Sequence, residues 1–177
     1  SVDLDGSHTP AIRGGEEVGY QRRKRRKTTN ALYLTDRKGQ PVVMSAPKSG
    51  EHHDTHNIIA AMQDMMADMA KANVRTDGLF LNADAGFDCA AFRSFLKSHG
   101  VVANIRINKR NGTGNDSIVL DELLYRERYS IERTNAWMDS FRTILNRFDT
   151  TLRNWESWNY IAFSVMLLRK WVRKRKV

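Results

Sequence analysis

The chain has 177 residues, of which 41% are hydrophobic, which is enough for one domain with a buried core and too few for two. Its 29 Lys and Arg exceed its 20 Asp and Glu, and this net charge of +9 favours a polyanionic partner, nucleic acid first and an anionic membrane second. The single cysteine, Cys89, excludes an intrachain disulfide and favours a reducing, cytoplasmic setting, and no apolar run approaches the roughly 18 residues of a membrane-spanning helix.

The first quarter of the chain predicts three antiparallel strands. The opening sequence SVDLDGS alternates apolar and acidic residues, which is typical of a strand, and Asp5 lies at its end. Residues 13–27 carry seven cations and three glycines and predict an exposed basic loop. Residues 28–36 and 40–46 predict two further strands, joined by a hairpin at Gly39.

The middle of the chain predicts alternating helices and strands. Residues 55–72 and 88–99 have helical patterns, and residues 79–83 and 101–107 are short apolar strands. Strands separated by helices run parallel through right-handed crossovers, whereas strands linked by hairpins run antiparallel. The sequence therefore predicts an α/β fold with a mixed five-stranded sheet and helices on both faces, in a single domain over residues 1–177.

The C-terminal part predicts two helices, over about 123–148 and 154–172. On the first of these, Tyr125, Arg128 and Glu132 fall on a strip beside the apolar stripe, at 100° per residue. Taken alone, a carboxylate among arginines is better explained as an ion-paired surface residue.

Two further carboxylates change this interpretation of Glu132. Asp5 ends the first strand and Asp84 follows residues 79–83, and open α/β sheets bind ligands beyond the carboxyl ends of their strands. If these strands are neighbours, the two carboxylates meet. Phosphodiester cleavage with Mg²⁺ needs hard oxygen ligands on rigid elements, and two aspartates with a helical glutamate would suffice.

Several segments carry a family resemblance. The segments DGSHTPA, TTNALYLTD, NADAGFD and YRERYSIERTNAWMDSFRTILNRFDT resemble successive blocks of the DDE transposases of bacterial insertion sequences, of the type related to insertion sequences four and five. The last block is the most specific, because Tyr125, Arg128 and Glu132 match the family's Tyr-x2-Arg-x3-Glu motif. The resemblance covers nearly the whole chain and implies an RNase H-like fold. It also implies that Asp5, Asp84 and Glu132 form the metal-binding catalytic triad, with the third acid on the C-terminal helices.

Two positions in these blocks leave alternatives open. Asp88 competes with Asp84, but the family pattern takes the first aspartate of an Asp-x-Gly-aromatic-Asp block, which here is Asp84. The glutamate motif usually ends on a Lys or Arg, where this chain has Asp139. Arg142, on a nearby face of the predicted helix, is a candidate replacement for that DNA contact.

Basic segments supply further candidate DNA contacts. Residues 22–27 and 169–176 are strongly basic, although a localisation signal or a solvated tail would also explain either of them. The candidate DNA-binding residues are Tyr125, Arg128, Lys24, Arg25, Lys27, Lys109, Arg110 and Arg142. The histidines at 52, 53 and 56 suggest zinc only weakly, because a fourth ligand is missing.

The combined interpretation is a transposase that cleaves DNA at transposon ends and joins the freed 3′ hydroxyl to target DNA, with Mg²⁺ as cofactor and Mn²⁺ as an alternative. We expect double-stranded DNA as the partner, a homodimer on DNA, and a location in the bacterial cytoplasm, at the nucleoid when bound. We also expect the chain to be the C-terminal portion of a longer transposase, without its N-terminal recognition region. The alternatives are a metal-dependent nuclease of the same fold without strand transfer, and a catalytically inactive DNA-binding relic. A basic structural protein is the weakest alternative, since it would need no carboxylate triad.

Overall fold

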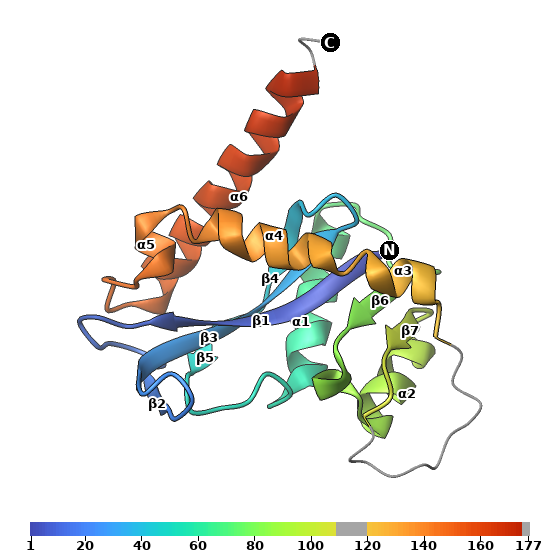
Figure 1. Cartoon of the computed structure of the whole chain (residues 1–177), viewed down its shortest axis with the longest axis horizontal. Coiled ribbons are helices and arrows are strands. Elements are labelled where there is room, and N and C mark those ends of the chain that lie inside the picture. The colour runs from blue at the N-terminus through green and yellow to red at the C-terminus, as the bar shows by residue number, and fades with distance from the viewer. Residues whose placement is uncertain (109–119, 175–177) are drawn as a thin grey trace.

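The computed structural model describes residues 1–108 and 120–174, which form a mixed sheet between two layers of helices (Figure 1). The strands are β1 (Val2–Pro10), β2 (Gly19–Gln21), β3 (Arg26–Asp36), β4 (Pro41–Met44), β5 (Lys48–Ser49), β6 (Phe80–Ala83) and β7 (Val102–Ile105). The main path runs β2-β3-β1-β6-β7, and β4 and β5 also pair with β3. Strands β1 and β3 are antiparallel, whereas β1, β6 and β7 are parallel. The predicted mixed sheet is therefore confirmed.

The predicted number of five strands is too low, because the described residues form seven. The two additional strands are β2, in the segment predicted as a basic loop, and β5, which follows β4. Both pair with β3 through backbone groups, β2 by a hairpin that matches Gly19 with Thr28 and Gln21 with Arg26. Backbone pairing at an exposed edge leaves no apolar pattern in the sequence, which is why neither strand was predicted.

The helices cover both faces of the sheet, as predicted. They are α1 (Ile58–Lys71), α2 (Ala90–Ser98), α3 (Glu122–Arg126), α4 (Tyr129–Met138), α5 (Arg142–Leu145) and α6 (Leu152–Lys174), with a 3₁₀ turn η1 at Ala85–Phe87. Strand β3 shows the two layers, because Leu32 and Leu34 pack in a core with α1 and α2, while Ala31 and Tyr33 pack in a second core with α4, α5 and α6. The outer end of α6 extends away from the sheet (Figure 1). No helix among residues 1–108 and 120–174 is both long enough and apolar enough to cross a membrane.

The long helix predicted over 123–148 is divided into α3, α4 and α5. At the first break the amides of Ser130 and Ile131 bond to carbonyls three residues back, at 2.9 and 3.2 Å, and this tighter turn reorients α4. At the second break Phe141 adopts an extended backbone (φ −91°, ψ 110°) before α5 begins. Helix α4 lies across one face of the sheet, over β1 and β3 (Figure 1), and β1 is the strand that holds Asp5.

Candidate active site

A ladder of buried polar side chains crosses three parallel strands. Asp3 of β1 pairs with Asn82 of β6, which pairs with Asn104 of β7, and these three residues are at most 2% exposed. Asn82 Nδ2 donates to Asp3 Oδ1 at 2.8 Å, and Asn104 Nδ2 donates to Asn82 Oδ1 at 2.8 Å. The polar ladder, as we call Asp3, Asn82 and Asn104, fixes these strands at one common level.

The polar ladder also holds the C-terminal helices. The hydroxyl of Ser130, on α4, donates to Asp3 Oδ2. Asn104 exchanges two hydrogen bonds with the backbone of Asp121, at 2.8 and 3.0 Å, and the Asp121 side chain caps α3 by accepting from the amide of Leu124. Burial raises the pKa of Asp3 and the hydrogen bonds from Ser130 and Asn82 oppose this, with a net upward shift. Helices α3 and α4 are thus held against the part of the sheet that carries the predicted catalytic acids.

Asp84 directly follows β6, as predicted, whereas Asp5 was predicted at the end of its strand but lies inside β1, which continues to Pro10 in its pairing with β3. Asp5 and Asp84 each lie two residues beyond the polar ladder, Asp5 beyond Asp3 and Asp84 beyond Asn82. Side chains alternate along a strand, so both carboxylates are placed on the face that α4 covers. Asp5 Oδ2 accepts a hydrogen bond from Asn135 Nδ2 of α4 at 3.2 Å, and Asp84 Oδ1 accepts from the amide of Gly86 at 2.7 Å. Strands β1 and β6 are neighbours in the sheet, which is the condition under which the sequence predicted that Asp5 and Asp84 lie close together.

The electrostatic surroundings of Asp5 would favour the binding of a cation. Burial raises the pKa of Asp5 to about 6, with Arg128 opposing the shift and the carboxylates of Asp54 and Asp84 adding to it. A divalent ion bound by Asp5 and Asp84 would offset both the burial and the repulsion between these carboxylates. This donor set of hard oxygens therefore fits Mg²⁺ or Mn²⁺.

Replacing Asp5 by Asn is expected to stabilise the metal-free protein at neutral pH. The folded chain binds a proton at Asp5 with a pKa of about 6, against 3.8 as the ordinary value, so this group lowers the stability as the pH rises from about 4 to about 6. Asp5→Asn should remove this loss and raise the free energy of unfolding at pH 7 by up to about 3 kcal/mol. Urea unfolding in EDTA at pH 4 and pH 7 measures this change in the free energy of unfolding. The control is Asp64→Asn, because Asp64 is exposed on α1. An unchanged pH dependence in Asp5→Asn would contradict this account.

Glu132 lies on the exposed side of α4. Arg128 acts on Asp5 electrostatically and Asn135 bonds it, and these residues stand four before and three after Glu132, within about 60° of it around a helix. Across residues 1–108 and 120–174, no group of three or more His, Cys, Asp or Glu side chains is placed to hold a metal ion. The convergence of Asp5, Asp84 and Glu132 thus stays a prediction.

The rival acid Asp88 has a different environment. Its carboxylate accepts from Arg93 Nε at 2.7 Å and from the backbone amide of Asn108 at 2.7 Å. These bonds connect the start of α2 to the segment that follows β7. The arrangement favours Asp84, which continues directly from β6, as the second acid of the site.

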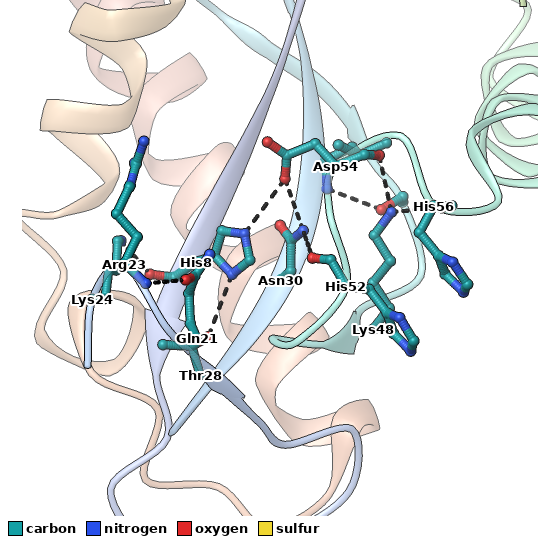
Figure 2. Close-up of polar contacts among 12 residues, drawn as sticks. His8, Gln21, Arg23, Lys24, Thr28, Asn30, Lys48, His52, Asp54 and His56 are labelled. Atoms are coloured by element: carbon teal, nitrogen blue, oxygen red, sulfur yellow. Dashed lines mark hydrogen bonds and ion pairs between the residues drawn. The ribbon is translucent and has the colours of Figure 1, made fainter. Parts of the chain in front are cut away.

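A second polar network lies along β1 and was not found from the sequence (Figure 2). Asp54 faces His8 and Asn30: Asn30 Nδ2 donates to Asp54 Oδ1 at 2.8 Å, and His8 Nε2 lies 3.6 Å from the same oxygen. Burial raises the pKa of Asp54, but the hydrogen bonds from His8 and Asn30 outweigh it, and the net shift is downward. A Cβ atom at Gly6 would come within 2.3 Å of Asp54 Oδ1. The absence of a side chain at Gly6, next to Asp5, therefore leaves room for the Asp54 carboxylate.

The histidine segment does not form a zinc site in the part of the chain that the structure describes. The rings of His52 and His56 stack with their centroids 3.9 Å apart, and Lys48 Nζ donates to the backbone carbonyls of Asp54 and His56 (Figure 2). Burial, with the cations nearby, lowers the pKa of His56.

The predicted DNA-binding residues have different environments. Lys24 Nζ donates to the carbonyl of His8 at 2.7 Å (Figure 2), and Lys24 and Asp139 line a cavity of about 460 Å³ next to β1. Burial lowers the pKa of Lys24, and Asp139 acts in the opposite direction. Arg25, Lys27 and Arg142 are exposed, whereas Lys109 and Arg110 lie outside the described residues. Tyr125 and Arg128 lie together, with the guanidinium carbon of Arg128 5.7 Å from the ring centroid.

Comparison with known proteins agrees with this arrangement. The family model described as a transposase DDE domain matches residues 2–167, which is nearly the whole chain. A search of curated proteins found no match. The match includes the polar ladder, Asp5, Asp84 and the helix that carries Glu132. The chain is a member of the transposase DDE-domain family.

Proposed function

We propose that the chain cleaves DNA strands at transposon ends and transfers the freed 3′ ends to target DNA. The family to which it belongs suggests DNA transposition and implies DNA as partner. The observation that carries the proposal is the placement of Asp5 and Asp84 on one face, each two residues beyond the paired residues Asp3 and Asn82 of the parallel strands β1 and β6, with the pKa of Asp5 raised to about 6. Acids whose pKa is raised by burial and by like charges mark functional sites.

Asp5, Asp84 and Glu132 would hold the divalent ions that this family generally uses, with Mg²⁺ as the proposed ion. When bound, such ions activate the attacking oxygen and stabilise the leaving oxygen of an in-line displacement. The protein itself would position the DNA, and it partly offsets the effect of burial on the carboxylates. Arg128 favours the ionised form of Asp5 and also that of Asp3.

Glu132 is proposed as the third acid because α4 is held on both sides of it. Ser130, two residues before, bonds Asp3, and Asn135, three residues after, bonds Asp5. Glu132 is therefore on a helix turn whose neighbours both contact the acidic edge of the sheet. Its carboxylate has to turn by about 60° around the helix to face Asp5, which a change of side-chain rotamer combined with a small shift of α4 can supply.

The basic residues around this edge would bind the DNA backbone. Arg25, Lys27 and Arg142 are exposed cations, Arg128 acts electrostatically on Asp5, and Tyr125 lies beside Arg128. Each phosphate contact would make binding depend on salt. A homodimer that holds two DNA ends stays a prediction of the family resemblance.

The proposal is tested with labelled duplexes that tile the DNA flanking this coding sequence, incubated with the protein, a supercoiled target plasmid and Mg²⁺. We expect nicked duplex and then labelled plasmid, and EDTA is expected to abolish both products because the acids alone supply no activated oxygen. Cleavage without labelled plasmid would instead indicate a nuclease. DNA binding without cleavage in either Mg²⁺ or Mn²⁺ would indicate a relic, and cleavage that survives EDTA would refute the metal site.

A further inference from the structure

Arg106 lies at the same edge of the sheet as the two aspartates, although it belongs to none of the family blocks quoted above. It follows Asn104 by two residues, as Asp84 follows Asn82 and Asp5 follows Asp3. Ile105 is buried in the core with α1 and α2, so Arg106 is directed toward the opposite face. A cation thus continues the row that Asp5 and Asp84 form, one strand beyond Asp84.

The Arg106 guanidinium is held by helix α3. Its Cζ atom lies 4.6 Å from the centroid of the Tyr125 ring, and its Nη2 atom lies 3.4 Å from Glu122 Oε2. The cation–π contact fixes the side chain while leaving it 53% exposed, so its remaining donors reach solvent.

The same tyrosine ring carries a second guanidinium, that of Arg128, at 5.7 Å. Two cations gathered at one ring repel each other unless an anion lies between them or beside them. The Nη1 atom of Arg128 is buried and has no hydrogen-bond partner within the described ranges. A charged donor without an acceptor costs free energy, so a further anionic acceptor at Nη1 would lower the free energy, although Asp3 and Asp5 already attract the Arg128 guanidinium.

We propose that Arg106 and Arg128, aligned by Tyr125, form a phosphate clamp that binds one backbone phosphate of DNA beside Asp84. Glu122 occupies Arg106 in the absence of DNA, and the phosphate displaces it. The planar guanidinium suits this task because it donates two parallel hydrogen bonds to phosphate oxygens. The identity of the anion as DNA rests on the proposed function, whereas the clamp itself rests on these contacts.

The test measures binding of a labelled 30-base-pair duplex in EDTA, as a function of NaCl concentration, so that cleavage plays no part. Arg106→Ala is expected to raise Kd about tenfold and to lower the steepness of log Kd against log[NaCl] by about one, as loss of one phosphate contact requires. Arg75→Ala, which removes an exposed arginine at the other end of β6, is the matched control and should leave the slope unchanged. An unchanged slope in Arg106→Ala would overturn the proposal.

Glu122→Gln gives a result of opposite sign. It frees Arg106 from its carboxylate and should lower Kd about two- to fivefold. In an Arg106→Ala background this gain should vanish, and a gain that persists there would show that Glu122 acts only through net charge and would contradict the clamp. Both arginine variants remain informative if the duplex-tiling assay finds no cleavage, because they report binding alone. Conversely, cleavage by the wild type with an unchanged slope in Arg106→Ala would remove the clamp and leave the proposed function standing.

Discussion

Glu132→Gln is expected to slow strand cleavage at least about a thousandfold while leaving DNA affinity nearly unchanged. The substitution keeps the size of the side chain and removes the charge that would bind a metal ion, and a loss of about 4 kcal/mol of transition-state stabilisation corresponds to that factor. Because Glu132 is exposed on α4, folding should not be affected. Single-turnover cleavage of the labelled transposon end with Mg²⁺, together with a binding titration in EDTA, separates the two effects.

The matched control is Glu127→Gln, which lies at the junction of α3 and α4. Glu127 bonds Arg37 at 2.6 Å on the surface, and such an exposed pair contributes about 1 kcal/mol or less. The control should therefore cleave at the wild-type rate. If a folded Glu132→Gln protein cleaves as fast as the control, Glu132 is not the third acid and the triad has to be sought elsewhere on α4.

Asp3→Leu is expected to cost about 4 kcal/mol of folding free energy, a large share of the 5 to 15 kcal/mol that holds most domains folded. Leucine has a similar size but no acceptor, so the amide of Asn82 would lose its bond, and the hydroxyl of Ser130 would keep only its long contact of 3.5 Å with the carbonyl oxygen of Asp36. Urea unfolding followed by circular dichroism measures the loss.

A double-mutant cycle separates the hydrogen bond from simple packing. Ser130→Ala should destabilise the wild type by about 1 to 2 kcal/mol, but should cost much less in the Asp3→Leu protein, where the hydroxyl has already lost its bond to Asp3. Equal costs in the two backgrounds would mean that the polar ladder does not connect β1 to α4. This measurement also tests whether the helix that carries Glu132 is positioned through Asp3.

The sequence was sufficient to predict the elements that carry the proposed acids. Period-two alternation identified β1, and short apolar runs identified β6 and β7, so Asp84 could be assigned to the end of its strand. That β1 and β6 are neighbours could be stated only as a condition, and Asp5 was assigned to a strand end although it lies inside β1. The number of strands and the division of the long helix were not predicted, because backbone pairing and local turns at Ser130 and Phe141 depend on tertiary contacts.

The polar contacts of the site were beyond sequence analysis for a different reason. Asp3 occupies a position that resembles the solvent side of an alternating strand, yet it is 1% exposed and bonds Asn82, 79 residues away, and Ser130, 127 residues away. Asp54 comes from the connection between β5 and α1, and no pattern links it to Asp5. Charge and spacing show which groups are present, whereas pairing across such distances follows only from the assembled sheet.

Strand β3 is buried on both faces along most of its length, by α1 on one side and by α4, α5 and α6 on the other. A gene copy interrupted ahead of residue 120 would therefore yield a polypeptide in which Ala31 and Tyr33 of β3 and Met44 of β4 face water. Such a fragment would be prone to aggregation and proteolysis and would not persist as a competitor for the element's DNA. Under the proposed function, truncation at the 3′ end of the gene would leave no folded chain to compete for DNA, whereas a point substitution at Glu132 would leave a folded protein that occupies DNA without cleaving it.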